Sequence, residues 1–151
     1  MNKELWYIHG VGTAIKQLGD GSIITATALR TLISTLVNEQ KVSEDKIYFG
    51  YIDIGPARGN INIPSFRLFT RLGAVIYGYE TEVYQKGVPY LRVSHGANYK
   101  LSQDNKKTVD LSKRTYKHEI RKALEAGYIG AQIALDRQTK SYSMVFYKMS
   151  K

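Results

Sequence analysis

The chain has 151 residues, with 22 Lys or Arg against 13 Asp or Glu, and carries a formal net charge of +9 at pH 7. The absence of cysteine excludes disulfide bonds and thiolate metal sites. Because no apolar run reaches the length of a signal peptide or a membrane-spanning helix, we expect a cytoplasmic protein without a membrane partner. A hydrophobic content of 43% over this length predicts one domain, residues 1–151, with a core of its own.

The first apolar segment, Leu5–His9, is rich in aromatic residues and predicts a strand. Gly10 and Gly12 follow it, as in the loop of a dinucleotide-binding domain. That fingerprint needs a third glycine where Ile15 stands, so the two glycines indicate an ordinary turn.

Two regular segments follow. Thr25–Gln40 predicts a helix, because its leucine, isoleucine and valine residues recur three and four positions apart. Lys46–Ile54 alternates in polarity and is rich in β-forming residues, which predicts a strand.

The next segment, Gly55–Asn60, has two glycines and a proline and predicts a loop. Arg58 at its tip is a candidate phosphate contact, although an exposed loop arginine needs no function. Ser65–Leu72 then predicts a short helix with Arg67 and Arg71 four residues apart, and a strand remains the alternative.

A β-hairpin is predicted for Ala74–Tyr84 and Val88–His95, turning around residues 85–87. A register that pairs Glu82 with Arg92 places opposite charges on one face of this hairpin. The polar segment that follows, Gly96–Thr108, predicts a long loop.

A second main helix is predicted for Asp110–Ala126. Asp110 suits the N-cap, because its carboxylate can accept from amides of the first turn, and Gly127 suits the left-handed position after the last turn. An apolar stripe at helical spacing would face the core, and its members are Tyr116, Ile120, Ala123 and Leu124.

The last predicted element is a hairpin of Tyr128–Asp136 and Ser141–Met149. The whole pattern predicts an α+β fold. We expect a mixed or mainly antiparallel sheet of six to seven strands, packed by the two main helices.

The segment Lys106–Lys122 concentrates positive charge. It carries seven Lys or Arg and two acidic residues, a local charge of +5 that exceeds half of the total. Its cations are Lys106, Lys107, Lys113, Arg114, Lys117, Arg121 and Lys122. A charged outer helix face is ordinary in soluble proteins, but like charges four residues apart destabilise a helix, which favours a polyanionic partner.

Catalytic patterns are sparse. The three histidines, His9, His95 and His118, lack the spacing of a metal site, and the strand carboxylates do not form the cluster of a metal-dependent nuclease. A hydrolase built on His9 and His95 would require the two rings to lie close together.

We therefore expect a basic, non-catalytic DNA-binding or RNA-binding protein without a cofactor or metal. The cations of Lys106–Lys122, together with Arg58, would contact phosphates, and Arg67 and Arg71 would extend the contact area. Tyr84 and Tyr90 are candidates for stacking on unpaired bases. The alternative is a small protein–protein interaction module, such as an inhibitor or a virion component of a phage or mobile element, that binds an acidic partner surface.

Overall fold

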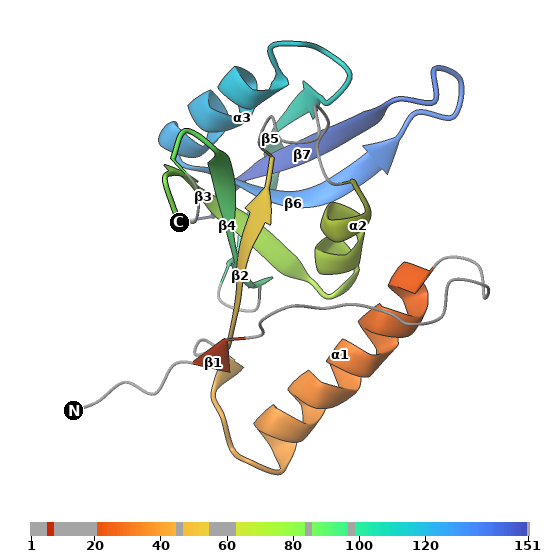
Figure 1. Cartoon of the computed structure of the whole chain (residues 1–151), viewed down its shortest axis with the longest axis vertical. Helices are drawn as coiled ribbons and strands as arrows, with labels where there is room; N and C mark the ends of the chain where they lie inside the picture. Colours follow the sequence, from red (N-terminus) through yellow and green to blue (C-terminus); the bar gives the residue numbers. More distant parts are fainter. Residues whose placement is uncertain are drawn as a thin grey trace.

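The structure is a computed structural model, and it describes residues 6–7, 21–44, 47–54, 63–83, 86–96 and 99–150. Three helices and seven strands lie within these ranges (Figure 1). In chain order they are β1 Trp6–Tyr7, α1 Gly21–Asn38, β2 Ile47–Asp53, α2 Ile63–Arg71, β3 Ala74–Thr81, β4 Pro89–His95, β5 Leu101–Asp110, α3 Tyr116–Glu125, β6 Tyr128–Leu135 and β7 Tyr142–Met149.

The strands form one sheet in the order β1-β2-β4-β3-β6-β7-β5. All neighbours are antiparallel except the two-residue β1, which pairs with β2 in parallel. The predicted α+β class with a mainly antiparallel sheet is confirmed. The two main helices correspond to α1 and α3, and α2 confirms the short helix predicted for Ser65–Leu72. The loop Gly55–Asn60 lies outside the described residues.

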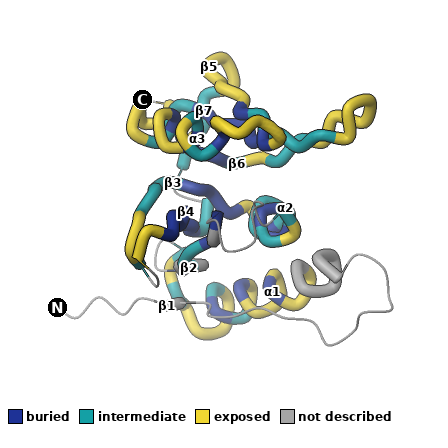
Figure 2. The backbone as a smooth tube through the Cα atoms, turned by 45° about the horizontal axis from the view of Figure 1, so that its top comes forward, coloured by how far each residue is buried: buried dark blue, intermediate teal, exposed yellow. Residues whose placement is uncertain are grey.

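The helices lie beside different strands of the sheet, in three successive levels. In Figure 2, β5, β7 and β6 lie with α3 at the top, β3 and β4 lie with α2 in the middle, and β2 lies with α1 at the bottom. Within the described residues, β3 and β6 have one register pair, Ile76 with Gly130. The two groups of strands are thus joined by very little main-chain pairing.

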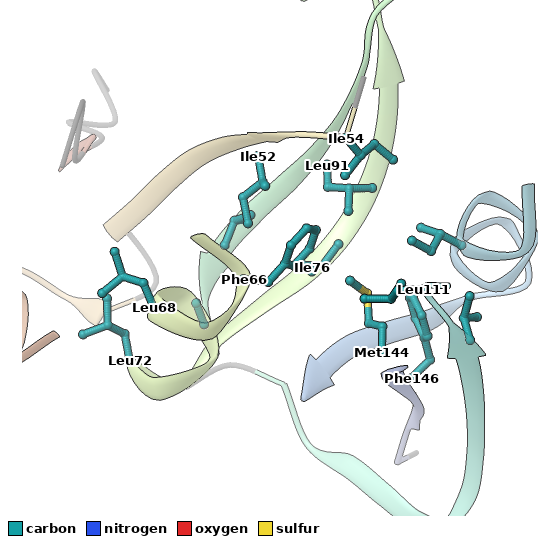
Figure 3. Close-up of a cluster of buried hydrophobic side chains, with 14 of the residues drawn as sticks. Ile52, Ile54, Phe66, Leu68, Leu72, Ile76, Leu91, Leu111, Met144 and Phe146 are labelled. Carbon is teal, nitrogen blue, oxygen red and sulfur yellow. The ribbon is translucent and has the colours of Figure 1, made fainter. Parts of the chain in front are cut away.

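Side chains join the two groups of strands instead. Phe66 of α2 is fully buried in one core cluster with Ile76 and Leu91 of the first group and Met144 and Phe146 of the second. In Figure 3 it lies beside Ile76, with Met144 and Phe146 beyond. The helix α2 is stabilised mainly by the packing of its buried residues, Phe66 and Leu68, rather than by intrinsic helix propensity.

Two predictions about the central hairpin differ in outcome. The hairpin itself is confirmed as β3 and β4, but the register that paired Glu82 with Arg92 is wrong. Leu91 pairs with Tyr79, and Arg92 forms its ion pair with Glu80, at 2.9 Å from Nε to Oε1. Register is set by the buried face of a strand, and Leu91 is fully buried.

The segment Gly96–Thr108, predicted as a loop, is largely strand β5. Its residues 103–108 are all exposed, so the alternation that marks a half-buried strand is absent from the sequence. Val109 supplies the buried anchor, opposite Met144 of β7. In the described chain β5 pairs with β7 alone, which makes it an edge strand.

The predicted start of the basic helix is also wrong. Asp110 is the last residue of β5, and its carboxylate accepts from the Ser112 amide at 2.9 Å and the Ser112 hydroxyl at 2.7 Å. The helix begins only after Thr115, because this side-chain turn and the pairing of Asp110 with Ser143 extend the strand. Gly127 has φ +75, as predicted for the residue after the last turn.

The carboxylate of Asp110 makes stability depend on acid pH. Hydrogen bonds from the Ser112 hydroxyl and then from its amide hold the pKa of Asp110 below its ordinary value. A lowered folded-state pKa stabilises the fold above the unfolded pKa of about 3.9, and this contribution is lost as pH falls through the folded pKa. The variant Asp110→Asn keeps the acceptor but not the charge. At pH 7 we expect this variant to have a lower free energy of unfolding in urea than the unmodified protein, and the difference should shrink as the pH falls to 2. A difference that stays constant over this range would contradict the role of the charge.

Candidate nucleic-acid interface

The cations of the basic segment lie on three consecutive pieces of structure. Lys106 and Lys107 belong to β5, Lys113 and Arg114 lie in the turn after it, and the others belong to α3. The sequence predicted that Lys113 and Arg114 belong to the same helix as Lys117, Arg121 and Lys122, and this is wrong. Arg58 lies outside the described residues.

Strand geometry separates the two β5 lysines. Lys107 pairs with Phe146 and lies on the sheet face that carries Val109 and α3, whereas Lys106 pairs with Tyr147 and lies on the opposite face. Both are exposed. Lysines on an edge strand also discourage unwanted strand pairing, which is an ordinary role for them.

The apolar stripe of α3 is confirmed. Tyr116, Ile120 and Ala123 are buried, and Leu124 packs partly against the same core. The helix thus turns its charged positions outward. We define the β5–α3 cationic surface as Lys107, Lys113, Arg114, Lys117, Arg121 and Lys122, all exposed except the half-buried Lys117.

Only one member of this surface forms an ion pair with another described residue. The Arg121 Nε lies 2.7 Å from Glu125 Oε1, one helical turn away. The hydrogen bond from Arg121 to Glu125, together with the charge of that carboxylate, raises the pKa of Arg121. The guanidinium also lies 5.9 Å from the centre of the Tyr79 ring on β3.

The C-terminal end of α3 is fixed by the neighbouring sheet. Lys148 of β7 donates to the Ala126 carbonyl, and its ammonium lies 4.7 Å from the centre of the Tyr128 ring. Tyr128 in turn donates to Asn105 of β5 at 2.9 Å. These contacts tie the helix end to β5, β6 and β7, so the β5–α3 cationic surface rests on an anchored scaffold.

Other predicted contacts do not join this surface. Arg67 and Arg71 are half-buried on α2, which Figure 1 shows apart from α3. Tyr90 is buried, because it lies on the central strand β4, and this corrects its prediction as a stacking residue. Tyr84 lies outside the described residues.

The histidines show no catalytic arrangement within the described chain. His95 is half-buried at the end of β4, with Nδ1 3.7 Å from Glu44 Oε2, and His118 is exposed on α3. His9 lies outside the described residues. No group of three or more His, Asp or Glu side chains in the described ranges is arranged to hold a metal ion, and no helix there is long and apolar enough to cross a membrane.

Sequence reasoning missed a hollow beside α3. It lies between the helix and β3, with a volume of about 280 Å³. Its lining residues are Tyr77, Gly78, Tyr79, Thr81, Arg121, Leu124 and Glu125. The one available signal was Gly78 within a strand pattern, since such a glycine often marks a bulge or a close approach.

Comparison with known proteins identifies no relative of this chain: no protein-family model, no curated protein and no solved structure matches it.

Proposed function

We propose that this protein binds nucleic acid without catalysis and that the β5–α3 cationic surface contacts the phosphates. The observation that carries the proposal is the charge balance of this surface. It groups six cations on one strand, turn and helix, and only Arg121 among them is paired with a described acidic residue. Unpaired cations at this density are the electrostatic footprint of a polyanion partner.

The position of two of these cations strengthens the proposal. Lys113 and Arg114 lie just before the first residue of α3, at the positive end of the helix dipole. Cations there are unfavourable for the isolated fold, whereas a phosphate would be attracted both by the side chains and by the dipole. A bound phosphate would therefore offset the repulsion between these two cations and the positive end of the α3 dipole.

Contacts of this kind predict a steep dependence of affinity on salt. Each neutralised phosphate contributes a slope of about −0.9 in log K against log salt for duplex DNA and about −0.7 for single strands. Six contacts correspond to a slope of roughly −4 to −5. Fluorescence anisotropy with labelled DNA and RNA from 50 to 200 mM NaCl measures it. Absence of binding, or a flat salt dependence, would remove the proposal.

A second candidate, binding to an acidic protein surface, is favoured by the edge strand. The outer edge of β5 carries no neighbouring strand within the described chain and is flanked by Lys106 and Lys107, so an acidic extended segment would find both main-chain partners and charge there. A pull-down from nuclease-treated lysate distinguishes the candidates. A nucleic-acid-binding protein loses its partners under this treatment, and an interaction module keeps one.

A further inference from the structure

The hollow between β3 and α3 exists because the sheet divides there. After the pair of Ile76 with Gly130, β3 and β6 have no further register pair, although both strands are fully described. The stretch Tyr77–Thr81 therefore has β4 on one side and the last turn of α3 on the other. Main-chain groups of a strand without a second neighbour are open to hydrogen bonding with a ligand.

A β-bulge turns aromatic groups toward this opening. The pairing of β3 with β4 shifts between Ile76 and Gly78, which makes Tyr77 the extra residue. Bulges redirect a side chain and are frequent beside functional sites. As a result, Tyr79 shares the buried face of Ile76, although residues three apart in a regular strand point to opposite faces. Both Tyr77 and Tyr79 line the hollow.

Gly78 makes room for an arginine on the other face of the same strand. A Cβ on Gly78 would lie 3.0 Å from Arg92 Cδ, closer than ordinary contacts, so glycine lets Arg92 lie across β3 without shifting. The Arg92 guanidinium then lies 5.6 Å from the centre of the Tyr77 ring and pairs with Glu80. The ring of Tyr77 thus contacts a cation, and Tyr77 also belongs to the lining of the hollow.

The polar groups of the hollow come from α3. Arg121 bonds to Glu125 through Nε, and no described residue bonds to its two terminal nitrogens. Arginine carries five N–H donors in a planar fork, so its other donors can reach a ligand while Glu125 holds the guanidinium in place. Glu125 and Thr81 add acceptor and donor groups to the rim.

We propose that this hollow binds one unpaired nucleobase of a single strand whose phosphates lie on the β5–α3 cationic surface. The proposal rests on the function proposed above and adds a preference for single strands. A volume of about 280 Å³ lies just below the range of pockets for drug-sized ligands, roughly 300–1,000 Å³, which suits one planar base. Tyrosine rings supply stacking, and Arg121, Glu125 and Thr81 supply hydrogen bonds to the base edge.

The strand reaches the hollow from the same helix that carries the phosphate contacts. Lys117 lies one turn before Arg121, and residues four apart lie on the same side of a helix. A phosphate at Lys117 and a base beside Arg121 are therefore compatible with one continuous chain of nucleotides. This adjacency favours a nucleic-acid strand over an isolated small molecule.

The test compares three ligands of equal length by fluorescence anisotropy: single-stranded oligothymidylate, a strand with the same phosphates but abasic sites, and a duplex. Stacking of one base is expected to make the oligothymidylate bind about 5- to 150-fold tighter than the abasic strand. The variant Tyr79→Leu is expected to abolish this difference while keeping the salt slope. The variant Tyr79→Phe, which retains the ring, is expected to keep the difference.

Two further variants make the result specific to the hollow. Tyr77→Leu removes the second ring. It replaces Tyr79→Leu in the test if circular dichroism shows that Tyr79→Leu does not fold. Tyr142→Leu removes a half-buried tyrosine on β7 that does not line the hollow, and it is expected to leave base discrimination unchanged.

The outcomes separate the two proposals. Equal, salt-dependent binding of the base-containing and abasic strands by the unmodified protein overturns the base site and leaves phosphate binding standing. Base discrimination that persists in both Tyr79→Leu and Tyr77→Leu also overturns it. If neither strand binds, the proposed function fails and the base site fails with it.

Discussion

Replacing Lys113, Lys117 and Lys122 together by glutamine is expected to weaken nucleic-acid binding several-hundredfold at 0.1 M salt. At that concentration each lost phosphate contact costs roughly a factor of ten, because its counterion contributes about 0.9 to the slope of log K against log salt. The slope itself should become less steep by about 2 to 3. Arg121 is left intact, because it is already paired with Glu125 and lines the hollow beside β3.

The matched control removes the same number of charges elsewhere. Lys41 follows α1, Lys100 precedes β5 at the end opposite to the turn with Lys113, and Arg137 lies in the β6–β7 turn, which projects away from α3 in Figure 1. Replacing these three by glutamine lowers the net charge equally. If this control and the variant of Lys113, Lys117 and Lys122 weaken binding to the same extent, the net charge of the protein is responsible and the β5–α3 cationic surface has no special role.

Replacing Phe66 by alanine is expected to lower the free energy of unfolding by about 3–5 kcal/mol. The side chain is fully buried in the core cluster that both groups of strands share, and its removal leaves a cavity beside Ile76 (Figure 3). Cavities in a close-packed core collapse only partly, so the lost contacts are not recovered. Urea unfolding followed by circular dichroism measures the change.

Leu32→Ala provides the comparison on another helix. Leu32 of α1 is 44% exposed, so its truncation should change the free energy of unfolding by less than about 1 kcal/mol. Similar losses in the two variants would mean that the burial of Phe66 does not make it more important for stability than an exposed leucine.

The elements that the sequence predicts correctly are those with a strong period. α1 and α3 show apolar residues at helical spacing, and the hairpins alternate between turns rich in glycine or polar residues. β5 escapes this reasoning, because an edge strand with six consecutive exposed residues has the composition of a loop. Its strand conformation follows from tertiary pairing with β7, which no local pattern of residues 103–108 encodes.

The candidate site also has one part that the sequence predicts and one part that it does not. The charge of Lys106–Lys122 is a matter of composition and was predictable, and the buried stripe of α3 follows from its spacing. The hollow was not predictable, since Tyr79 and Arg121 are distant in the chain and meet only when α3 packs beside β3. The bulge at Tyr77 likewise depends on how β3 and β4 align, which the buried Leu91 decides.

The single bridge of Ile76 with Gly130 has a mechanical consequence. Two strand groups that share one main-chain bridge are held together mainly by side chains, which in the described chain include the core around Phe66 and the contact of Arg121 with Tyr79. We expect that a small rotation at this bridge would change the width of the hollow while leaving the strand pairing within each group intact. Amide hydrogen exchange at Ile76 and Gly130, measured with and without an oligonucleotide, is expected to change if the two groups move at this bridge.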